Sequence, residues 1–375
     1  MKILYVTDAL AIWGGIERVL SDKLNYLVQE YGYEIYVVTS DQGKHPIPFP
    51  LDVRIHVKDM NIRFHQQYNY RGIKRIMKCR ELQKMYRNQL RLYIAEVNPD
   101  IISCIRDGCA SAVLDVVSTI PVIFESHAMY RDVAFENSTL FHRISTYSDR
   151  LKFGKLSRLV TLTEGDANDW KRVCKNVCVI PNVVHLNESG KYSRCEAKKA
   201  IFAGRFDLQK DVDSLAKVWA LVQQRHPDWT LNVYGNGELK PHFEEIVSDK
   251  KLNVIVHPAV QDIFDKYIES SMLLLTSRYE PFGLVLVEAM SCGLPVIAFD
   301  CPYGPADIIT DGQDGFLVEE GNIDAFSDHV CKLVEDLNKR QEMGRKAIAS
   351  SQRYRVDRIM PIWKQLFWEL ATEGK

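Results

Sequence analysis

Two cations and two carboxylates in the second half of the sequence have the spacing of an anion- and hydroxyl-binding site. Arg205 and Lys210 follow a β-rich run and precede a segment of helical periodicity. Glu280 lies just before a second helical segment that starts near Phe282, and Glu288 lies within that segment. Cationic side chains and backbone N–H groups at a helix start bind anions, whereas a carboxylate beside them binds hydroxyl groups. The pattern predicts a ligand that carries both phosphate and hydroxyl groups.

Each of these residues also has a simpler explanation. Arg205 or Lys210 taken singly could be a solvated surface charge, and an acidic residue near a helix start often only offsets the helix dipole. Glu288 lies among the apolar residues 285–287 and Ala289, so its carboxylate should be at least partly buried. Burying a carboxylate without a partner is costly, and a ligand hydroxyl is one partner that would explain it.

The amino-terminal half carries a weaker signal. Gly14-Gly15 follows the first β-rich run and opens a helical segment, where backbone N–H groups could approach an anion, although the pair is also an ordinary turn. The spacing is not Gly-x-Gly-x-x-Gly. The second expected strand ends at Thr39-Ser40 and lacks the acidic residue that binds the ribose in a dinucleotide-binding fold. This pattern argues against a nicotinamide-dependent dehydrogenase.

β-rich runs alternate with helical segments along the whole chain, which predicts an α/β fold of parallel sheets built from βαβ units. In the first half we expect strands at Lys2–Thr7, Glu34–Thr39, Val53–Val57, Asp100–Ile105, Pro121–Glu125, Leu159–Thr163 and Val177–Ile180. In the second half we expect them at Ala200–Ala203, Thr230–Tyr234, Val254–His257, Met272–Thr276, Pro295–Phe299 and Gly315–Val318.

The two series predict two Rossmann-like, doubly wound domains. The first should span residues 1–182 and the second residues 183–352, with a polar linker beginning at Pro181. The aromatic helical segment 353–375 should pack back onto the amino-terminal domain. Sheets of this kind bind ligands beyond the carboxyl ends of their strands, so we expect the domains to face each other across an interdomain cleft.

Composition excludes several classes of protein. At 375 residues the chain is too long for one ordinary core, and 48 Lys and Arg against 49 Asp and Glu give no bulk attraction to nucleic acid. Nine cysteines without a Cys-x-x-Cys pair indicate a reducing cytoplasm. The amino end resembles a strand rather than a signal peptide, and no apolar run is long enough to span a bilayer. We therefore expect a cytoplasmic protein.

One segment is strongly basic, although the chain as a whole has nearly equal numbers of basic and acidic residues. Between residues 71 and 91, eight basic residues accompany a single acidic one, Glu81, with apolar residues interleaved at helical spacing. The basic positions are Arg71, Lys74, Arg75, Lys78, Arg80, Lys84, Arg87 and Arg91. Such a helix could lie on the inner face of the cytoplasmic membrane or hold a polyprenyl diphosphate, or it could be a solvated face. No nucleic-acid recognition module accompanies the charge.

Asp211 and Asp213 have the Asp-x-Asp spacing of metal-dependent sugar transferases, but they begin a helix, where aspartate favours the dipole. Because side chains already supply cations, we expect neither a metal nor another cofactor.

Together these motifs resemble the retaining nucleotide-sugar glycosyltransferases of family 4, which have the GT-B fold. The resemblance covers essentially the whole chain and rests on residues 204–210, 235–237, 280–288 and 293–296. Gly14-Gly15, Pro181-Asn182 and residues 304–309 also match bacterial members that build capsule, lipopolysaccharide or other surface glycans. The chain departs from the family at Asp211, where many members have glycine, and at residues 183–185, where Gly-Val-Asp is usual.

The resemblance implies a role for each motif. Arg205 and Lys210 would hold the donor diphosphate, Glu288 the ribose hydroxyls, and Glu280 with the amides of residues 282–284 the donor sugar. His127, in Glu125-Ser126-His127, falls where the family keeps a histidine near the sugar. The implied catalytic residues are His127, Arg205, Lys210 and Glu280. The implied substrate-binding residues are Gly14, Gly15, Asn182, Gly204, Gly235, Gly237, Phe282, Gly283, Leu284 and Glu288.

The resemblance implies retaining transfer of a sugar from a nucleotide diphosphate donor, with UDP favoured, in surface-glycan biosynthesis. The acceptor would be a glycan, with a polyprenyl-linked one preferred, held by the amino-terminal domain through loops such as residues 61–70 and 130–140. Two alternatives stay open, namely a UDP-sugar epimerase of the same architecture and a non-catalytic protein that binds sugars or nucleotides.

Overall fold

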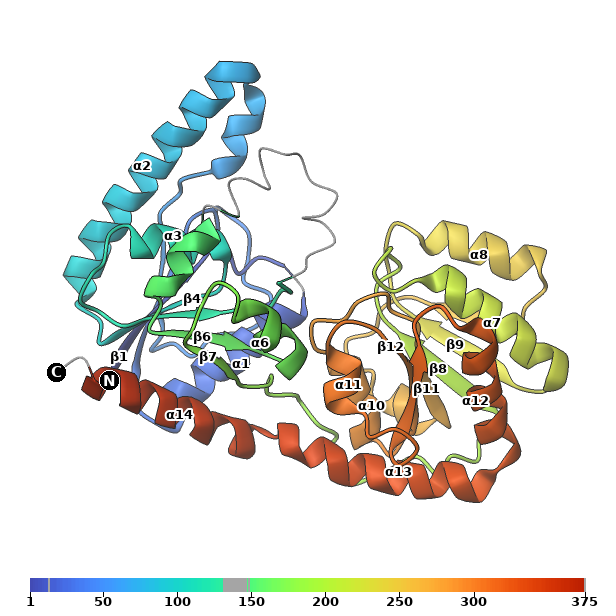
Figure 1. The fold of residues 1–375 in the computed structure, drawn as a ribbon. Helices are drawn as coiled ribbons and strands as arrows, with labels where there is room; N and C mark the ends of the chain where they lie inside the picture. Colours follow the sequence, from blue (N-terminus) through green and yellow to red (C-terminus); the bar gives the residue numbers. More distant parts are fainter. Residues whose placement is uncertain (13, 131–146, 148, 374–375) are drawn as a thin grey trace. The chain divides into compact units, whose positions relative to one another are not determined.

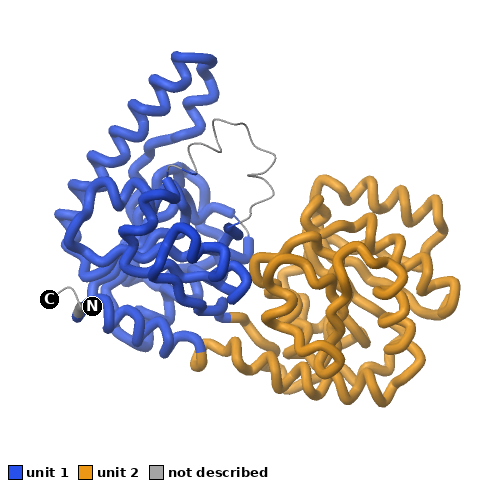
Figure 2. Tube along the Cα trace, viewed as in Figure 1, with its two compact units in different colours: residues 1–183, 359–375 blue, residues 184–358 orange. Residues whose placement is uncertain are grey.

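The fold was analysed in a computed structural model, which describes residues 1–12, 14–130, 147 and 149–373 (Figure 1). Part of the expected acceptor loop, residues 131–140, lies outside the described residues. The chain divides into two compact units (Figure 2). Unit 1 contains Met1–Val183 and Ile359–Lys375, and unit 2 contains Val184–Arg358. The last helix, α14 (Val356–Glu373), therefore begins in unit 2 and continues in unit 1.

Unit 1 is built on a seven-stranded parallel sheet with the order β3-β2-β1-β4-β5-β6-β7. Its strands are β1 (Lys2–Thr7), β2 (Glu34–Thr39), β3 (His56–Asp59), β4 (Ile101–Cys104), β5 (Val122–Glu125), β6 (Arg158–Thr161) and β7 (Val177–Val179). The helices that the structure describes in this unit are α1 (Gly15–Gln29), η1 (Phe64–Asn69), α2 (Gly72–Val97), α3 (Asp107–Leu114), η2 (Leu151–Lys155), α6 (Glu164–Trp170) and most of α14.

Unit 2 is built on a six-stranded parallel sheet with the order β10-β9-β8-β11-β12-β13. Its strands are β8 (Lys199–Ala203), β9 (Thr230–Tyr234), β10 (Val254–His257), β11 (Met272–Leu275), β12 (Val296–Asp300) and β13 (Gly315–Glu319). Its helices are α7 (Val212–Arg225), α8 (Lys240–Asp249), α9 (Phe264–Ile268), α10 (Leu284–Ser291), α11 (Gly304–Ile308), α12 (Ile323–Glu335), α13 (Leu337–Ser351) and η3 (Gln352–Tyr354).

Both sheets confirm the predicted doubly wound architecture. In each unit the chain runs outward from a central strand, β1 or β8, and then crosses to the other side at β4 or β11. The central strands β4, β5 and β11 are buried at every residue, as expected for parallel strands covered on both faces. Ligands bind to such sheets at the carboxyl ends of the strands beside the crossover. The loops after β1, β8 and β11 are therefore the places to look for a site.

The third strand lies later than predicted. The run Val53–Val57 has high β-propensity, but Val53 is 99% exposed and the strand forms at His56–Asp59. β3 is the edge strand next to β2, and three of its four residues are exposed. At an edge strand the position is set by pairing with the neighbouring strand, here Tyr36 opposite His56, more than by burial of branched side chains.

A buried carboxylate lies against the aromatic core of unit 1. Trp170 is fully buried and packs on Phe124 and Phe153, and its indole N–H donates to Asp166 Oδ2 at 3.0 Å. The backbone N–H of Tyr130 donates to the other carboxylate oxygen at 2.7 Å. Burial outweighs these hydrogen bonds and raises the pKa of Asp166 to about 7.

We expect this carboxylate to make unit 1 less stable as the pH rises. Between about pH 4 and 7, Asp166 is ionised in the unfolded chain and protonated in the folded one, so the free energy of unfolding falls by up to about 4 kcal/mol. Asp166→Asn cannot ionise and should lack this decline. Urea unfolding of both proteins from pH 4 to pH 8 tests it, and parallel pH profiles would contradict the raised pKa.

Helix α2 reaches beyond the body of unit 1, and its amino-terminal half stands clear of the sheet (Figure 1). Its carboxyl-terminal half is anchored by six buried residues. These are Leu82, Tyr86, Leu90, Tyr93, Ile94 and Val97. In the outer half, Ile73 and Met77 are 76% and 65% exposed. Among the helices that the structure describes, none has the length and apolar character needed to cross a bilayer.

Candidate active site

The loops that follow β8 and β9 pack backbone against backbone. Gly204 N–H donates to the carbonyl of Tyr234 at 3.0 Å, and Phe206 N–H donates to that of Asn236 at 3.0 Å. A Cβ atom on Gly235 would lie 1.9 Å from the Gly204 carbonyl oxygen, and one on Gly237 would lie 2.4 Å from that of Phe206. Close packing of the loops thus accounts for both glycines, and their contact with a substrate stays a prediction.

Lys210 and Glu280, which were assigned to different parts of the ligand, form one buried pair. Each is 8% exposed, and Lys210 Nζ lies 2.5 Å from Glu280 Oε2. The Ser277 hydroxyl donates to the same oxygen at 3.3 Å. The pairing follows from topology, because β8 and β11 are neighbours and the loops that follow them meet. The two site residues act as one unit rather than as separate contacts.

Arg205 is the solvent-exposed cation of this loop. Its side chain is 75% exposed, and its Nε lies 3.2 Å from Asp207 Oδ2. A surface ion pair of this kind contributes about 0 to 1 kcal/mol, so Arg205 can exchange Asp207 for a bound anion at little cost. Its five donors match a diphosphate well.

The helix start beside Glu280 lies two residues later than predicted. Helix α10 begins at Leu284, and Gly283 at the N-cap has a φ of 105°, a left-handed conformation that favours glycine. Phe282 lies outside the helix, is 3% exposed, and packs edge-on against Tyr354 at 5.4 Å. Because Gly283 has no side chain, no side-chain cap covers the first N–H groups of α10, beginning with Leu284.

Glu288 is buried, as the sequence predicts, but it has a protein partner that sequence reasoning missed. The hydroxyl of Tyr267, on α9, lies 3.4 Å from Glu288 Oε2, and both residues are at most 9% exposed. A ligand hydroxyl is therefore not needed to explain the burial of this carboxylate. Its role toward a ribose stays a prediction.

The two aspartates of the Asp-x-Asp motif contact different side chains. Asp211 has a φ of 46°, which explains why glycine suits this position in the family, and its carboxylate accepts from Ser214 N–H at 3.3 Å. Arg278 reaches the same carboxylate through Nε and a terminal nitrogen, at 3.2 and 3.4 Å. Asp213 contacts His242 Nε2 at 2.9 Å. Among the described residues, no cluster of three or more His, Cys, Asp or Glu could hold a metal ion.

In unit 1, Gly14 and Gly15 lie at the start of α1. Gly14 is the N-cap residue, and a Cβ atom there would lie 2.8 Å from Glu17 Oε2. Glu17 is 6% exposed, so the first turn of α1 is already faced by a buried carboxylate of its own. The close atom is the end of a flexible side chain, so this packing does not by itself require glycine at position 14, and anion binding by the glycine pair stays a prediction.

His127 and Asn182 line the same small cavity of unit 1, which has a volume of about 10 Å³. His127 Nε2 lies 3.5 Å from Glu125 Oε2. Glu125 is in turn paired with Lys23 of α1, and Trp363 of α14 lines the cavity with them. Sequence reasoning missed Lys23, because a lysine in an amphipathic helix usually marks the solvent-exposed side of that helix. It also missed that Trp363 lines this cavity.

The comparisons with known proteins agree with this arrangement. A model of the family described as "Glycosyltransferase Family 4" matches residues 13–188, and one described as "Glycosyl transferases group 1" matches residues 188–350. A Haemophilus influenzae protein named an uncharacterized glycosyltransferase is 28% identical over 356 residues, which cover 94% of this chain and 95% of that protein. The amylovoran biosynthesis glycosyltransferase AmsD of Erwinia amylovora is 26% identical over 377 residues, which cover 97% of this chain and 99% of that protein.

A solved structure gives the same fold. A variant of TarM from S. aureus, crystallised with UDP, has a TM-score of 0.76 at 17% identity, over 98% of this chain and 99% of that chain. Because the two family matches together run from residue 13 to residue 350, the chain belongs to glycosyltransferase family 4 and is a glycosyltransferase with the GT-B fold.

Proposed function

We propose that this enzyme transfers a sugar, with retention of configuration, from a UDP-sugar to a glycan acceptor in surface-polysaccharide biosynthesis. The observation that carries the proposal is the grouping of Arg205 with the Lys210–Glu280 pair beside the β8–β11 crossover. The relatives that cover nearly the whole chain are named glycosyltransferases, one of them in amylovoran biosynthesis, which supports transfer over epimerisation or simple binding. UDP is favoured because TarM was crystallised with it.

The chemistry follows from where charge develops. When the anomeric bond breaks, negative charge grows on the departing diphosphate and positive charge on the sugar ring. Arg205 and Lys210 would stabilise the diphosphate, and the amides at the start of α10 would add their dipoles. These groups supply positive charge without a metal ion, so we propose that transfer needs none.

Retention does not require a covalent intermediate here. Glu280 Oε2 is held by Lys210 and Ser277, which suits a carboxylate that orients Lys210 and binds a sugar hydroxyl more than one that attacks carbon. We propose instead that the acceptor attacks from the face of the leaving diphosphate, and that a diphosphate oxygen accepts the proton of the acceptor.

Calorimetric titration with UDP and GDP in the presence of EDTA tests the donor proposal. We expect micromolar UDP binding that resists EDTA, because the cationic side chains replace a metal. GDP should bind more weakly. Binding that appears only after Mg²⁺ is added would contradict metal independence, and no binding of either nucleotide under any condition would contradict the donor site itself.

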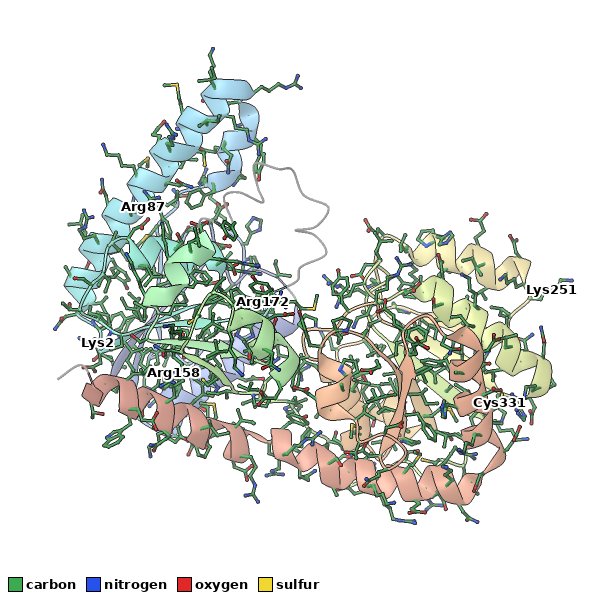
Figure 3. The ribbon with its side chains drawn as sticks, in the orientation of Figure 1. Lys2, Arg87, Arg158, Arg172, Lys251 and Cys331 are labelled. Carbon is green, nitrogen blue, oxygen red and sulfur yellow. The ribbon has the colours of Figure 1, made fainter. Side chains whose placement is uncertain are left out.

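We also propose that the acceptor is lipid-linked and that α2 brings the enzyme to the inner face of the cytoplasmic membrane. Ile73, Met77, Arg80, Lys84 and Arg91 recur at intervals of three, four or seven residues and therefore share one face of the helix. All five are exposed. Figure 3 shows side chains projecting around the outer half of α2, with Arg87 marking where it nears the body of unit 1. An apolar tip followed by a basic stripe suits an anionic bilayer.

Vesicle sedimentation tests this membrane proposal. Each basic residue near an anionic surface contributes about 1 kcal/mol, so the triple variant Arg80→Gln, Lys84→Gln, Arg91→Gln should bind phosphatidylglycerol vesicles on the order of 100-fold more weakly. The control variant Lys44→Gln, Lys171→Gln, Lys175→Gln changes the net charge equally at other exposed positions of unit 1. Equal binding by both variants would show that α2 is a solvated face.

A further inference from the structure

An ion pair lies in the interior of unit 1, where apolar residues would be expected. Lys23 projects from α1 and Glu125 ends β5, and their side chains are 4% and 2% exposed. Lys23 Nζ is hydrogen-bonded to Glu125 Oε2. The hydroxyl of Ser103, on β4, donates to Glu125 Oε1 at 2.6 Å. The pair therefore joins helix α1 to the neighbouring strands β4 and β5.

The lysine is enclosed by aromatic rings. Lys23 Nζ lies 3.5 Å from the centroid of the Trp363 ring, on α14, and 5.2 Å from that of Tyr5, on β1. Trp363 is 5% exposed and Tyr5 is fully buried, so these rings keep water from the ammonium group. An aromatic face stabilises a desolvated cation more strongly than an exposed one.

Fold stability does not explain why the pair is there. Replacing a buried ion pair by apolar residues of similar volume is often neutral or stabilising, because desolvating two charges offsets their attraction. Lys23 occupies the same buried side of α1 as Leu20, Leu24 and Leu27, where a methionine would fit the pattern. A charged pair in this place is better explained by its effect on the position and protonation of a neighbouring side chain.

That neighbouring side chain is the imidazole of His127. It is 8% exposed, and its Nε2 is buried without a hydrogen bond to any described residue. This Nε2 lies 3.5 Å from Glu125 Oε2, the oxygen that accepts from Lys23, which leaves the carboxylate as the acceptor within reach of it. The adjoining cavity, of about 10 Å³, has room for roughly one water molecule. A carboxylate accepts hydrogen bonds, so it favours the imidazole form whose proton is on Nε2 and leaves Nδ1 as an acceptor.

We propose that Lys23 and Glu125 are positioning residues for His127: Glu125 selects the Nε2–H tautomer and fixes the ring, Lys23 keeps Glu125 ionised, and Trp363 shields the pair from water. The proposal rests on the proposed function only in taking His127 as a participant in transfer. Burial opposes ionisation of Glu125, but the charge of Lys23 and the contact with His127 outweigh it and lower the pKa of Glu125. The carboxylate thus stays charged at neutral pH.

The test is a double variant, Lys23→Met with Glu125→Gln, which removes both charges at nearly constant volume. A single substitution would leave one buried charge unpaired and could unfold the protein. The control is Lys58→Met with Glu96→Gln, since Lys58 Nζ lies 3.3 Å from Glu96 Oε2 and 4.1 Å from the Tyr93 ring centroid on the surface of the same unit. Thermal unfolding confirms that each variant is folded.

Two measurements report on His127. Long-range 15N NMR of the histidine rings, with His127→Asn to assign the signal, should show an Nε2–H tautomer in the wild type and in the control. The double variant should show a mixture of tautomers, and its kcat should fall tenfold or more while the donor KM changes little. Glu125→Asp keeps both charges but lengthens the contact, so it should shift the same signal without endangering the fold.

The outcomes separate the two ideas. An Nδ1–H tautomer in the wild type, or a His127 signal that is unchanged in the double variant, overturns the positioning role whatever the activity is. A changed His127 signal with an unchanged kcat supports the positioning but overturns the participation of His127 in the proposed function.

Discussion

Arg205→Ala is expected to lower the kcat of sugar transfer on the order of 100-fold while leaving thermal unfolding unchanged. The side chain is 75% exposed, and the ion pair that it forms with a described residue is the surface pair with Asp207 in its own loop, so its removal should leave the fold of unit 2 intact. The loss should be larger in kcat than in the affinity for UDP, because the charge on the diphosphate grows as the sugar departs.

Two further variants make this expectation specific. Arg205→Lys keeps the charge but loses the forked pair of donors, so it should recover only part of the rate. Arg355→Ala is the matched control, because Arg355 also lies in unit 2, is about half exposed, and pairs with an aspartate two residues later, Asp357, at 3.0 Å. A similar loss in both alanine variants would show that the effect is a general one of surface charge.

The sequence predicts most of the fold because parallel strands buried on both faces are continuous apolar runs. β1, β2, β9 and β10 lie at the predicted residues, and the other buried strands differ by one or two residues at their ends. The edge strand β3 is the exception, because pairing rather than burial sets its position. The other edge strands, β7, β10 and β13, lie within one residue of the prediction, so the failure is specific to the exposed run before β3.

The site is predictable only as far as local motifs reach. Glycines, cations and helix starts are recognisable in short stretches, but the Lys210–Glu280 bond joins residues 70 positions apart, and the Lys23–Glu125 bond joins residues 102 apart. Both depend on the order of strands in a sheet, which no local motif contains. Tyr267 escaped notice for the same reason, because nothing near it in the sequence marks it as a partner of Glu288.

Lys210→Ala should destabilise the protein by about 3 to 5 kcal/mol as well as remove transfer activity, because it leaves the Glu280 carboxylate buried without its cation. Urea unfolding measures the loss of stability. Lys198→Ala is the control, since Lys198 pairs with Asp228 on the surface of unit 2 with side chains 63% and 53% exposed. The control should lose less than about 1 kcal/mol.

The double variant Lys210→Met with Glu280→Gln separates stability from chemistry. It removes both charges, so the protein should unfold at nearly the wild-type urea concentration, yet UDP binding should weaken because the buried cation is gone. If this variant binds UDP as tightly as the wild type, Lys210 serves the fold and not the diphosphate. If Lys210→Ala is as stable as Lys198→Ala, the buried pair contributes nothing to folding, and the presence of two opposite charges there would have to be explained by the ligand alone.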